Sequence, residues 1–130
     1  MKPFEISVDL PRRLLSMRMR GFWDAATFDA FAGEFSSALK ELHRMGGCEM
    51  ALVDGSEFAV QSRDILGRFA DIMRENERYL AKRTASVIPT ELNRMQAARV
   101  GESLARRDFR SRAEAEAWLF GSESGAERAA

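Results

Sequence analysis

The chain has 130 residues, of which 45% are hydrophobic and 31% charged, so it can close one hydrophobic core but is short for two. Twenty basic residues balance twenty acidic ones, and this net charge of zero argues against a nucleic-acid partner. The N-terminus lacks the apolar block of a signal peptide, and no apolar run reaches the roughly 20 residues of a membrane-spanning helix. The single cysteine, Cys48, excludes an internal disulfide. These features predict a cytoplasmic protein without a membrane span.

Two strands are predicted at the N-terminus. Apolar and polar residues alternate over 4–10 and again over 15–20, which is the period of a strand with one buried face. The hairpin that joins them should place acidic residues of the first strand opposite basic residues of the second, in a solvated ion-pair face rather than an anion site. These residues are Glu5, Asp9, Arg18 and Arg20.

A long amphipathic helix should follow. Asp24 is a good N-cap, apolar residues recur at three- and four-residue steps over 28–42, and Gly46 with Gly47 supplies the stop. The stripe contains three phenylalanines, and we interpret it as core rather than as a ligand site. Burying such side chains stabilises a fold by about 1.5–3 kcal/mol each, so this helix should be a principal core element.

The middle of the chain reads as a strand, a loop and a second helix. Residues 49–54 form a nearly continuous apolar run, which is typical of a strand covered on both faces. A loop is expected over 55–58. Apolar residues at helical spacing then begin after Ser62, whose hydroxyl is the expected N-cap of this second helix.

The C-terminal third should contain two more strands and two more helices. A strand is predicted over 83–88, a helix capped by Thr90, and a brief strand over 107–110. Ser111 and the glutamate three residues later match a capping box, so a last helix should run through Leu119.

The order of these elements, β-β-α-β-α-β-α-β-α, predicts an α/β fold with a single mixed β-sheet and helices packed against it. We expect this domain to comprise residues 1–120. Residues 121–130 are polar and carry no packing signal, and a flexible tail is predicted there. Exposed strand edges and Arg-rich surfaces would permit a homodimer.

The residue patterns of enzymes and metal sites are missing from the sequence. His43 and Cys48 flank a glycine turn, but two candidate ligands do not make a zinc site, and a nucleophile pair would need an orienting partner. We interpret His43 as a helix-end cation and Cys48 as a small buried thiol. No glycine-rich phosphate loop is present. The sequence therefore predicts a non-enzymatic protein without cofactor or metal, and an enzyme built around His43 and Cys48 is the remote alternative.

Three segments resemble the SpoIIAA-like, STAS-related family. They are Ala51–Ser56, Thr84–Ile88, and Phe109 followed by Ala115–Leu119. The resemblance spans Phe4 to Leu119 and implies a STAS/SpoIIAA-like fold. STAS domains of the anti-sigma-factor-antagonist type bind protein partners, and a partner kinase phosphorylates a serine at the start of the helix after their third strand.

The resemblance implies a non-enzymatic regulatory or protein-interaction domain, with Ser62 at the position of the phosphorylated serine. The segment 60–64 lacks the second serine and the glycine of the Asp-Ser-Ser-Gly-like segment in those antagonists. The residue types favour a structural N-cap at Ser62 over a phosphorylation site. The predicted partner-binding residues lie between the third strand and the second helix. They are Asp54, Ser56, Glu57, Ser62 and Arg63.

A small-molecule or lipid-binding carrier is the alternative function. The family is also compared with lipid-exchange domains, and the chain has nine Phe and seven Met residues that could line an adaptable apolar cavity. Against this alternative, the same residues at helical spacing are needed to fill the core.

Overall fold

A computed structural model describes the backbone of residues 2–100 and 106–129, and the side-chain environments of residues 2–97 and 106–121. The elements of this part of the chain are β1 (Phe4–Asp9), β2 (Leu14–Gly21), α1 (Ala25–Arg44), β3 (Met50–Phe58), α2 (Arg63–Glu75), the 3-10 helix η1 (Glu77–Tyr79), β4 (Arg83–Val87), α3 (Glu91–Val100), β5 (Arg106–Phe109) and α4 (Arg112–Ala129). This order of strands and α-helices confirms the predicted one.

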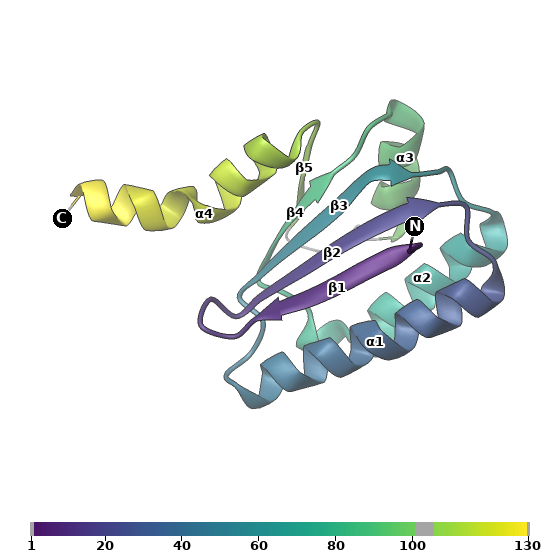
Figure 1. The fold of residues 1–130 in the computed structure, drawn as a ribbon, viewed down its shortest axis with the longest axis horizontal. Helices are drawn as coiled ribbons and strands as arrows, with labels where there is room; N and C mark the ends of the chain where they lie inside the picture. Colours follow the sequence, from purple (N-terminus) through teal and green to yellow (C-terminus); the bar gives the residue numbers. More distant parts are fainter. Residues whose placement is uncertain (1, 101–105, 130) are drawn as a thin grey trace.

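The five strands form one mixed sheet in the order β1-β2-β3-β4-β5. The hairpin β1–β2 is antiparallel, whereas β2, β3, β4 and β5 run parallel to their neighbours. Each parallel step requires a crossover connection, and the helices α1, α2 and α3 provide these connections. Helices α1 and α2 lie on one face of the sheet, and α4 lies on the opposite face (Figure 1). The sheet is the single mixed sheet that the sequence predicts.

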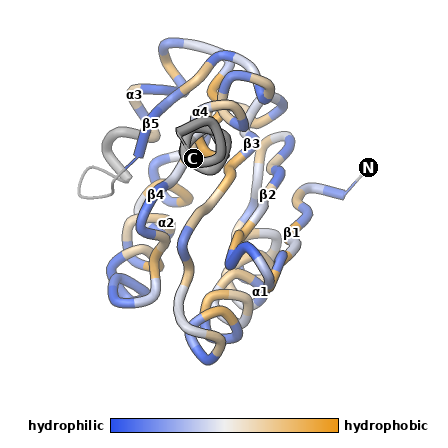
Figure 2. The backbone as a smooth tube through the Cα atoms, turned by 90° about the vertical axis from the view of Figure 1, so that its left-hand side faces the viewer, coloured by the Kyte–Doolittle hydropathy of each residue, from blue (hydrophilic) through white to orange (hydrophobic). Residues whose placement is uncertain are grey.

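Two hydrophobic clusters hold the layers together. On the α1–α2 face, an aromatic group forms the centre of the core. Its members are Trp23, Phe28, Phe31, Phe35 and Phe69. On the opposite face, Leu52 of β3 packs with Ala115 and Leu119 of α4, both fully buried. Figure 2 shows the hydrophobic stretch of β3 between β2 and β4. Helices therefore cover both faces of β3, as the nearly continuous apolar run over 49–54 predicts.

Side-chain caps begin the helices at the predicted residues. The Asp24 carboxylate accepts a hydrogen bond from Thr27 N at 2.8 Å, and Ser62 Oγ accepts one from Ile65 N at 3.2 Å. Ser111 Oγ accepts a bond from Glu114 N at 3.2 Å. Each cap satisfies a backbone N–H that has no partner within its helix.

The segment 55–58, predicted as a loop, is the last part of β3. It pairs with the end of β2, where Arg20 lies opposite Glu57 and Gly21 opposite Phe58. The register shifts between Arg18 and Arg20, so a bulge precedes these pairs. The sequence Gly-Ser indicates a turn locally, but pairing with a distant strand overrides that preference.

One further prediction, the pairing of Asp9, needs correction. Asp9 lies opposite Leu14 rather than opposite an arginine, because the hairpin is tight, and its carboxylate accepts a bond from Arg12 N at 3.3 Å in the turn. The last helix runs through Leu119, as predicted, and its backbone continues to Ala129. The flexibility expected of 121–130 stays a prediction.

Candidate functional site

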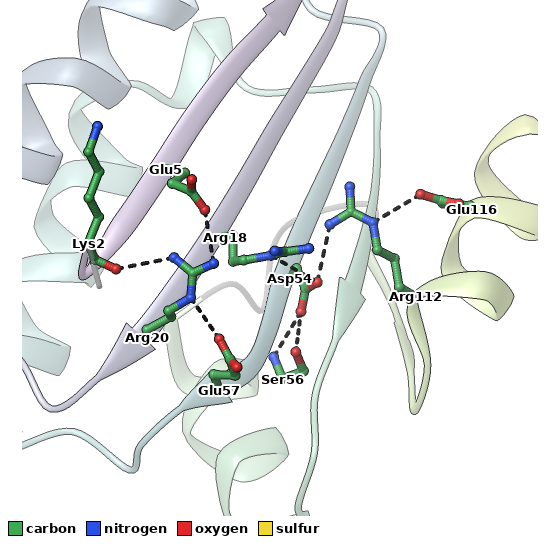
Figure 3. Close-up of polar contacts among 9 residues, drawn as sticks. All are labelled: Lys2, Glu5, Arg18, Arg20, Asp54, Ser56, Glu57, Arg112 and Glu116. Atoms are coloured by element: carbon green, nitrogen blue, oxygen red, sulfur yellow. Dashed lines mark hydrogen bonds and ion pairs between the residues drawn. The ribbon is translucent and has the colours of Figure 1, made fainter.

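Asp54, on β3, is the most deeply buried of the predicted site residues, with 4% of its surface exposed. A buried carboxylate needs strong partners to stay ionised. Ser56 donates from both its backbone N and its Oγ to Asp54 Oδ1, at 3.0 and 2.6 Å. Two guanidinium groups approach the other oxygen, Oδ2: Arg18 Nε at 3.5 Å and Arg112 Nη1 at 3.2 Å (Figure 3).

These partners decide the charge of Asp54. Burial raises the pKa of the carboxyl, but the hydrogen bonds from Ser56 and Arg112 and the positive charge of Arg18 outweigh it, so the pKa lies below its ordinary value. Asp54 is therefore ionised at neutral pH. Arg112 also donates to Glu116 at 3.0 Å, which fixes its guanidinium along the first turn of α4. The arrangement fastens α4 to the sheet and uses both oxygens of the carboxylate.

Glu57 belongs to a second ion-pair group on the same strands. Arg20 Nε donates to Glu57 Oε2 at 2.7 Å, and Arg20 Nη2 lies 3.0 Å from Glu5 Oε2 on β1. Arg20 Nη1 also donates to the backbone oxygen of Lys2 at 3.2 Å (Figure 3). The pair of Glu5 with Arg20 confirms the predicted ion-pair face for these two residues. Pairs with one exposed member contribute little to stability, so their main effect is to order the end of the sheet.

Ser62 and Arg63 begin α2, which packs on the face of the sheet opposite α4. Ser62 is half-buried and caps the helix, whereas Arg63 is exposed. No hydrogen bond or ion pair within the described residues joins these two to Asp54, Ser56 or Glu57. The structure thus places the five predicted residues in two groups, and their roles in binding stay predictions.

Gln61, which the sequence did not single out, organises the approach to α2. Its side chain is buried, with Oε1 accepting from Trp23 N at 2.9 Å and Nε2 donating to Gly21 O at 2.8 Å and Ala59 O at 2.7 Å. Its backbone exchanges two further bonds with the Gln96 side chain on α3, at 2.9 and 3.1 Å. One glutamine therefore connects the end of β2, the loop after β3, and α3. A lone Gln in a loop has no periodic signal that could have predicted this role.

Three exposed apolar residues are chain neighbours of residues in this network. Phe22 is 67% exposed, Met95 52% and Val60 37%. Each is next in the chain to a residue that is hydrogen-bonded to Gln61 or is Gln61 itself. We call Phe22, Val60, Arg63 and Met95 the junction surface. Sequence patterns could not separate these apolar residues from core residues, because only the fold decides which ones are buried.

The His43 and Cys48 alternative has no support in the geometry. Cys48 is buried and donates from Sγ to Met50 O at 3.3 Å. Burial raises the pKa of this thiol to about 11, which opposes the thiolate that a nucleophile requires. His43 instead lies edge-on to Tyr79, with ring centroids 4.9 Å apart. Among the described residues, no group of three or more His, Cys, Asp and Glu side chains could hold a metal ion.

Solved structures share this fold at low sequence identity. The unphosphorylated form of the anti-sigma factor antagonist SpoIIAA matches with a TM-score of 0.63 and 19% identity, over 91% of this chain and 96% of that one. An uncharacterized DUF3478-family protein with a SpoIIAA-like fold, from Shewanella loihica, matches with a TM-score of 0.69 and 18% identity, over 92% and 95%. No family model and no curated protein matches the sequence. None of the described helices is long and apolar enough to cross a membrane. The chain has the SpoIIAA-like fold.

Proposed function

We propose that this SpoIIAA-like domain is a non-enzymatic regulatory module that binds a protein partner through the junction surface. The observation that carries the proposal is the set of exposed apolar side chains held around the buried Gln61 network. Aromatic, Met and Arg side chains are enriched at protein interfaces, and a backbone already fixed by hydrogen bonds loses little entropy on binding. The solved structure of SpoIIAA, an anti-sigma factor antagonist, supports this class of function. We place the protein in the cytoplasm.

Ser62 would be the switch of this module. A phosphate adds about −1.5 to −2 charges at neutral pH, and here it would lie at a helix N-terminus beside Arg63, both of which favour an anion. Asp64 opposes it. The new charge would stand next to Val60 and would weaken the docking of an apolar partner surface. The cap that Ser62 provides in the unmodified protein is compatible with this second role.

A comparison of two charge insertions tests the surface. Phe22→Glu places a carboxylate on the junction surface, whereas Met45→Glu places one at the opposite end of α1, on a side chain that is also exposed, at 57%. We expect a partner captured by the wild-type protein to be lost with Phe22→Glu and retained with Met45→Glu. Size-exclusion chromatography of the same variants shows whether the partner is a second copy of the chain.

The assignment of binding to the junction surface is wrong if Phe22→Glu and Arg63→Glu both retain every partner that the wild-type protein captures. Circular dichroism of each variant must first match the wild type, so that a loss of binding reports the surface and not the fold. Ser62→Glu should weaken the same partner if the switch is real, while Ser62→Ala should keep it. Equal binding by Ser62→Glu and Ser62→Ala would contradict the switch and leave the surface intact.

A further inference from the structure

A cavity of about 140 Å³ lies between the sheet and the helices α2 and α3. Its walls are mostly apolar, with Val53 from β3, Phe69 and Met73 from α2, and Ala97 from α3. The cavity is partly open to the protein surface, so a small molecule could enter it. An apolar cavity of roughly 150 Å³ can hold a molecule such as benzene, so this one has room for a ligand of about one ring.

Most polar groups in the wall already have partners. Gln61 and Gln96 bond to each other and to backbone groups, and Asn93 Nδ2 donates to Phe58 O at 3.0 Å. Arg106 Nη1 donates to Ala97 O at 2.8 Å, and its Nε lies 3.1 Å from the carboxylate of Asp108. The charge of Arg106 is thus balanced within the protein. The wall offers no free charge among its described residues.

Two hydroxyl groups on β4 differ from these polar groups because they have no hydrogen-bond partner among the described residues. Thr84 and Ser86 point from alternate positions of the strand toward the cavity, and they are 7% and 5% exposed. Neither hydroxyl has a hydrogen bond to another residue within the described parts of the chain. Among the described residues, Asp108 Oδ1 is the one fully buried side-chain polar atom without a hydrogen-bond partner, so the oxygens of Thr84 and Ser86 keep some accessible surface. Both residues line the cavity, and their hydroxyls are free to bond to a polar group of a molecule bound there.

We propose that this cavity binds a small uncharged molecule with an apolar body of about one ring and one hydroxyl or carbonyl group. The apolar body fills the space between Val53 and Met73, and the polar group hydrogen-bonds to Thr84 and Ser86. A charged ligand is excluded because its desolvation would have no compensating charge. This site is separate from the partner surface of the proposed function, and either can exist without the other.

Three probes of similar size test the ligand class by NMR titration of the full chain: phenol, toluene and benzoate. We expect phenol and toluene to shift the amide signals of Val53 and Ser86 in a saturable way, and benzoate to leave them unchanged. In Ser86→Ala the Kd of phenol should rise about threefold to tenfold, the effect of one hydrogen bond, with no weakening of toluene. The absence of saturable shifts in the wild-type protein overturns the site.

A matched pair of leucine substitutions tests the location. Ala97→Leu fills the cavity from α3 and should abolish the phenol shifts, whereas Ala113→Leu, on the exposed side of α4, should preserve them. Phenol binding that survives Ala97→Leu would place the ligand elsewhere and overturn the proposal. If Ala97→Leu does not fold, the phenol and toluene titrations of Ser86→Ala decide alone. This substitution removes a single oxygen atom, so we expect the variant to fold. An equal change of the phenol and toluene Kd values in Ser86→Ala would exclude the role of the hydroxyls.

Discussion

Two polar networks connect distant parts of this chain, and they differ in charge. The Gln61 network is neutral and buried, and its amide bonds mainly to backbone groups of Gly21, Trp23 and Ala59. The Asp54 network is ionic, and the side chains of its two arginines are 41% and 39% exposed. The first fixes the entry to α2, and the second fastens α4 to the sheet.

The difference in charge decides how each network responds to solution conditions. Neutral hydrogen bonds between buried groups change little with pH or salt, so the junction surface should keep its shape across conditions. A carboxylate held between two partly exposed guanidinium groups loses its stabilising effect when it is protonated, and salt screens it. A change of pH or ionic strength should therefore affect the attachment of α4 to the sheet more than the shape of the junction surface.

Removal of the Gln61 side chain should have the largest effect. Gln61→Ala leaves the N–H of Trp23 and the carbonyl of Ala59 without this partner, whereas the Gly21 carbonyl keeps its bond from Ala59 N at 3.2 Å. An unsatisfied buried group costs about 1–3 kcal/mol. Since water can reach some of these groups, we expect a loss of about 2–4 kcal/mol in the free energy of unfolding. Urea denaturation at pH 5 and pH 8 should give the same loss.

Gln96→Ala is the control for that prediction. It removes two bonds to the Gln61 backbone but leaves the Gln61 side chain in place. Its loss should be smaller, about 1–2 kcal/mol. If the two variants lose equal stability, the Gln61 side chain is not the centre of the network.

Asp54→Asn should have an intermediate effect that depends on pH. The folded protein lowers the pKa of Asp54, so its contribution to stability is complete above the unfolded pKa of about 3.9 and disappears as pH falls through the lower folded value. We expect the variant to lose about 1–3 kcal/mol at pH 7, the contribution of hydrogen bonds to a charged group. The difference should shrink as the pH falls below about 3.9, and it should also shrink in 1 M NaCl. Urea denaturation across this pH range measures it.

Glu57→Gln serves as the matched control, since Glu57 is also an ion-paired carboxylate but is 54% exposed. Its stability should stay close to that of the wild type at every pH. A pH-independent loss in Asp54→Asn, or an equal loss in Glu57→Gln, would contradict the assignment of the buried charge to Asp54.

Loss of the cap at Ser62 should have the smallest effect of the series. Ser62→Ala removes the acceptor for Ile65 N, and such a change costs about 1 kcal/mol. Ser37→Ala, at an exposed position inside α1, should leave the denaturation midpoint unchanged or raise it, because Ala is the better helix former. An unchanged midpoint in Ser62→Ala would refute the cap.

Local chemistry made much of the fold predictable from the sequence. Asp24, Ser62 and Ser111 identify helix starts because each side chain bonds within its own turn. The apolar run before Asp54 identifies a central strand for a similar reason, since burial on both faces removes the alternation of polar residues. These signals need no knowledge of distant parts of the chain.

The candidate site depends on contacts that the sequence does not encode locally. Arg112 meets Asp54 across 58 positions, and the Gln61 side chain meets Gly21 across 40. The end of β3 was predicted as a loop because its pairing partner on β2 is also distant in the chain, with 37 positions between Arg20 and Glu57. The exposure of Phe22 follows from where the sheet ends, which no pattern around it reveals.

Photo-crosslinking from the junction surface tests the central claim most directly. A photoreactive amino acid is placed at position 22 in one protein and at position 45 in another, because both side chains are apolar and exposed. We predict a discrete covalent adduct of one protein partner from position 22 and none from position 45. Adducts of the same partner from both positions, or from position 45 alone, would contradict the assignment of binding to the junction surface.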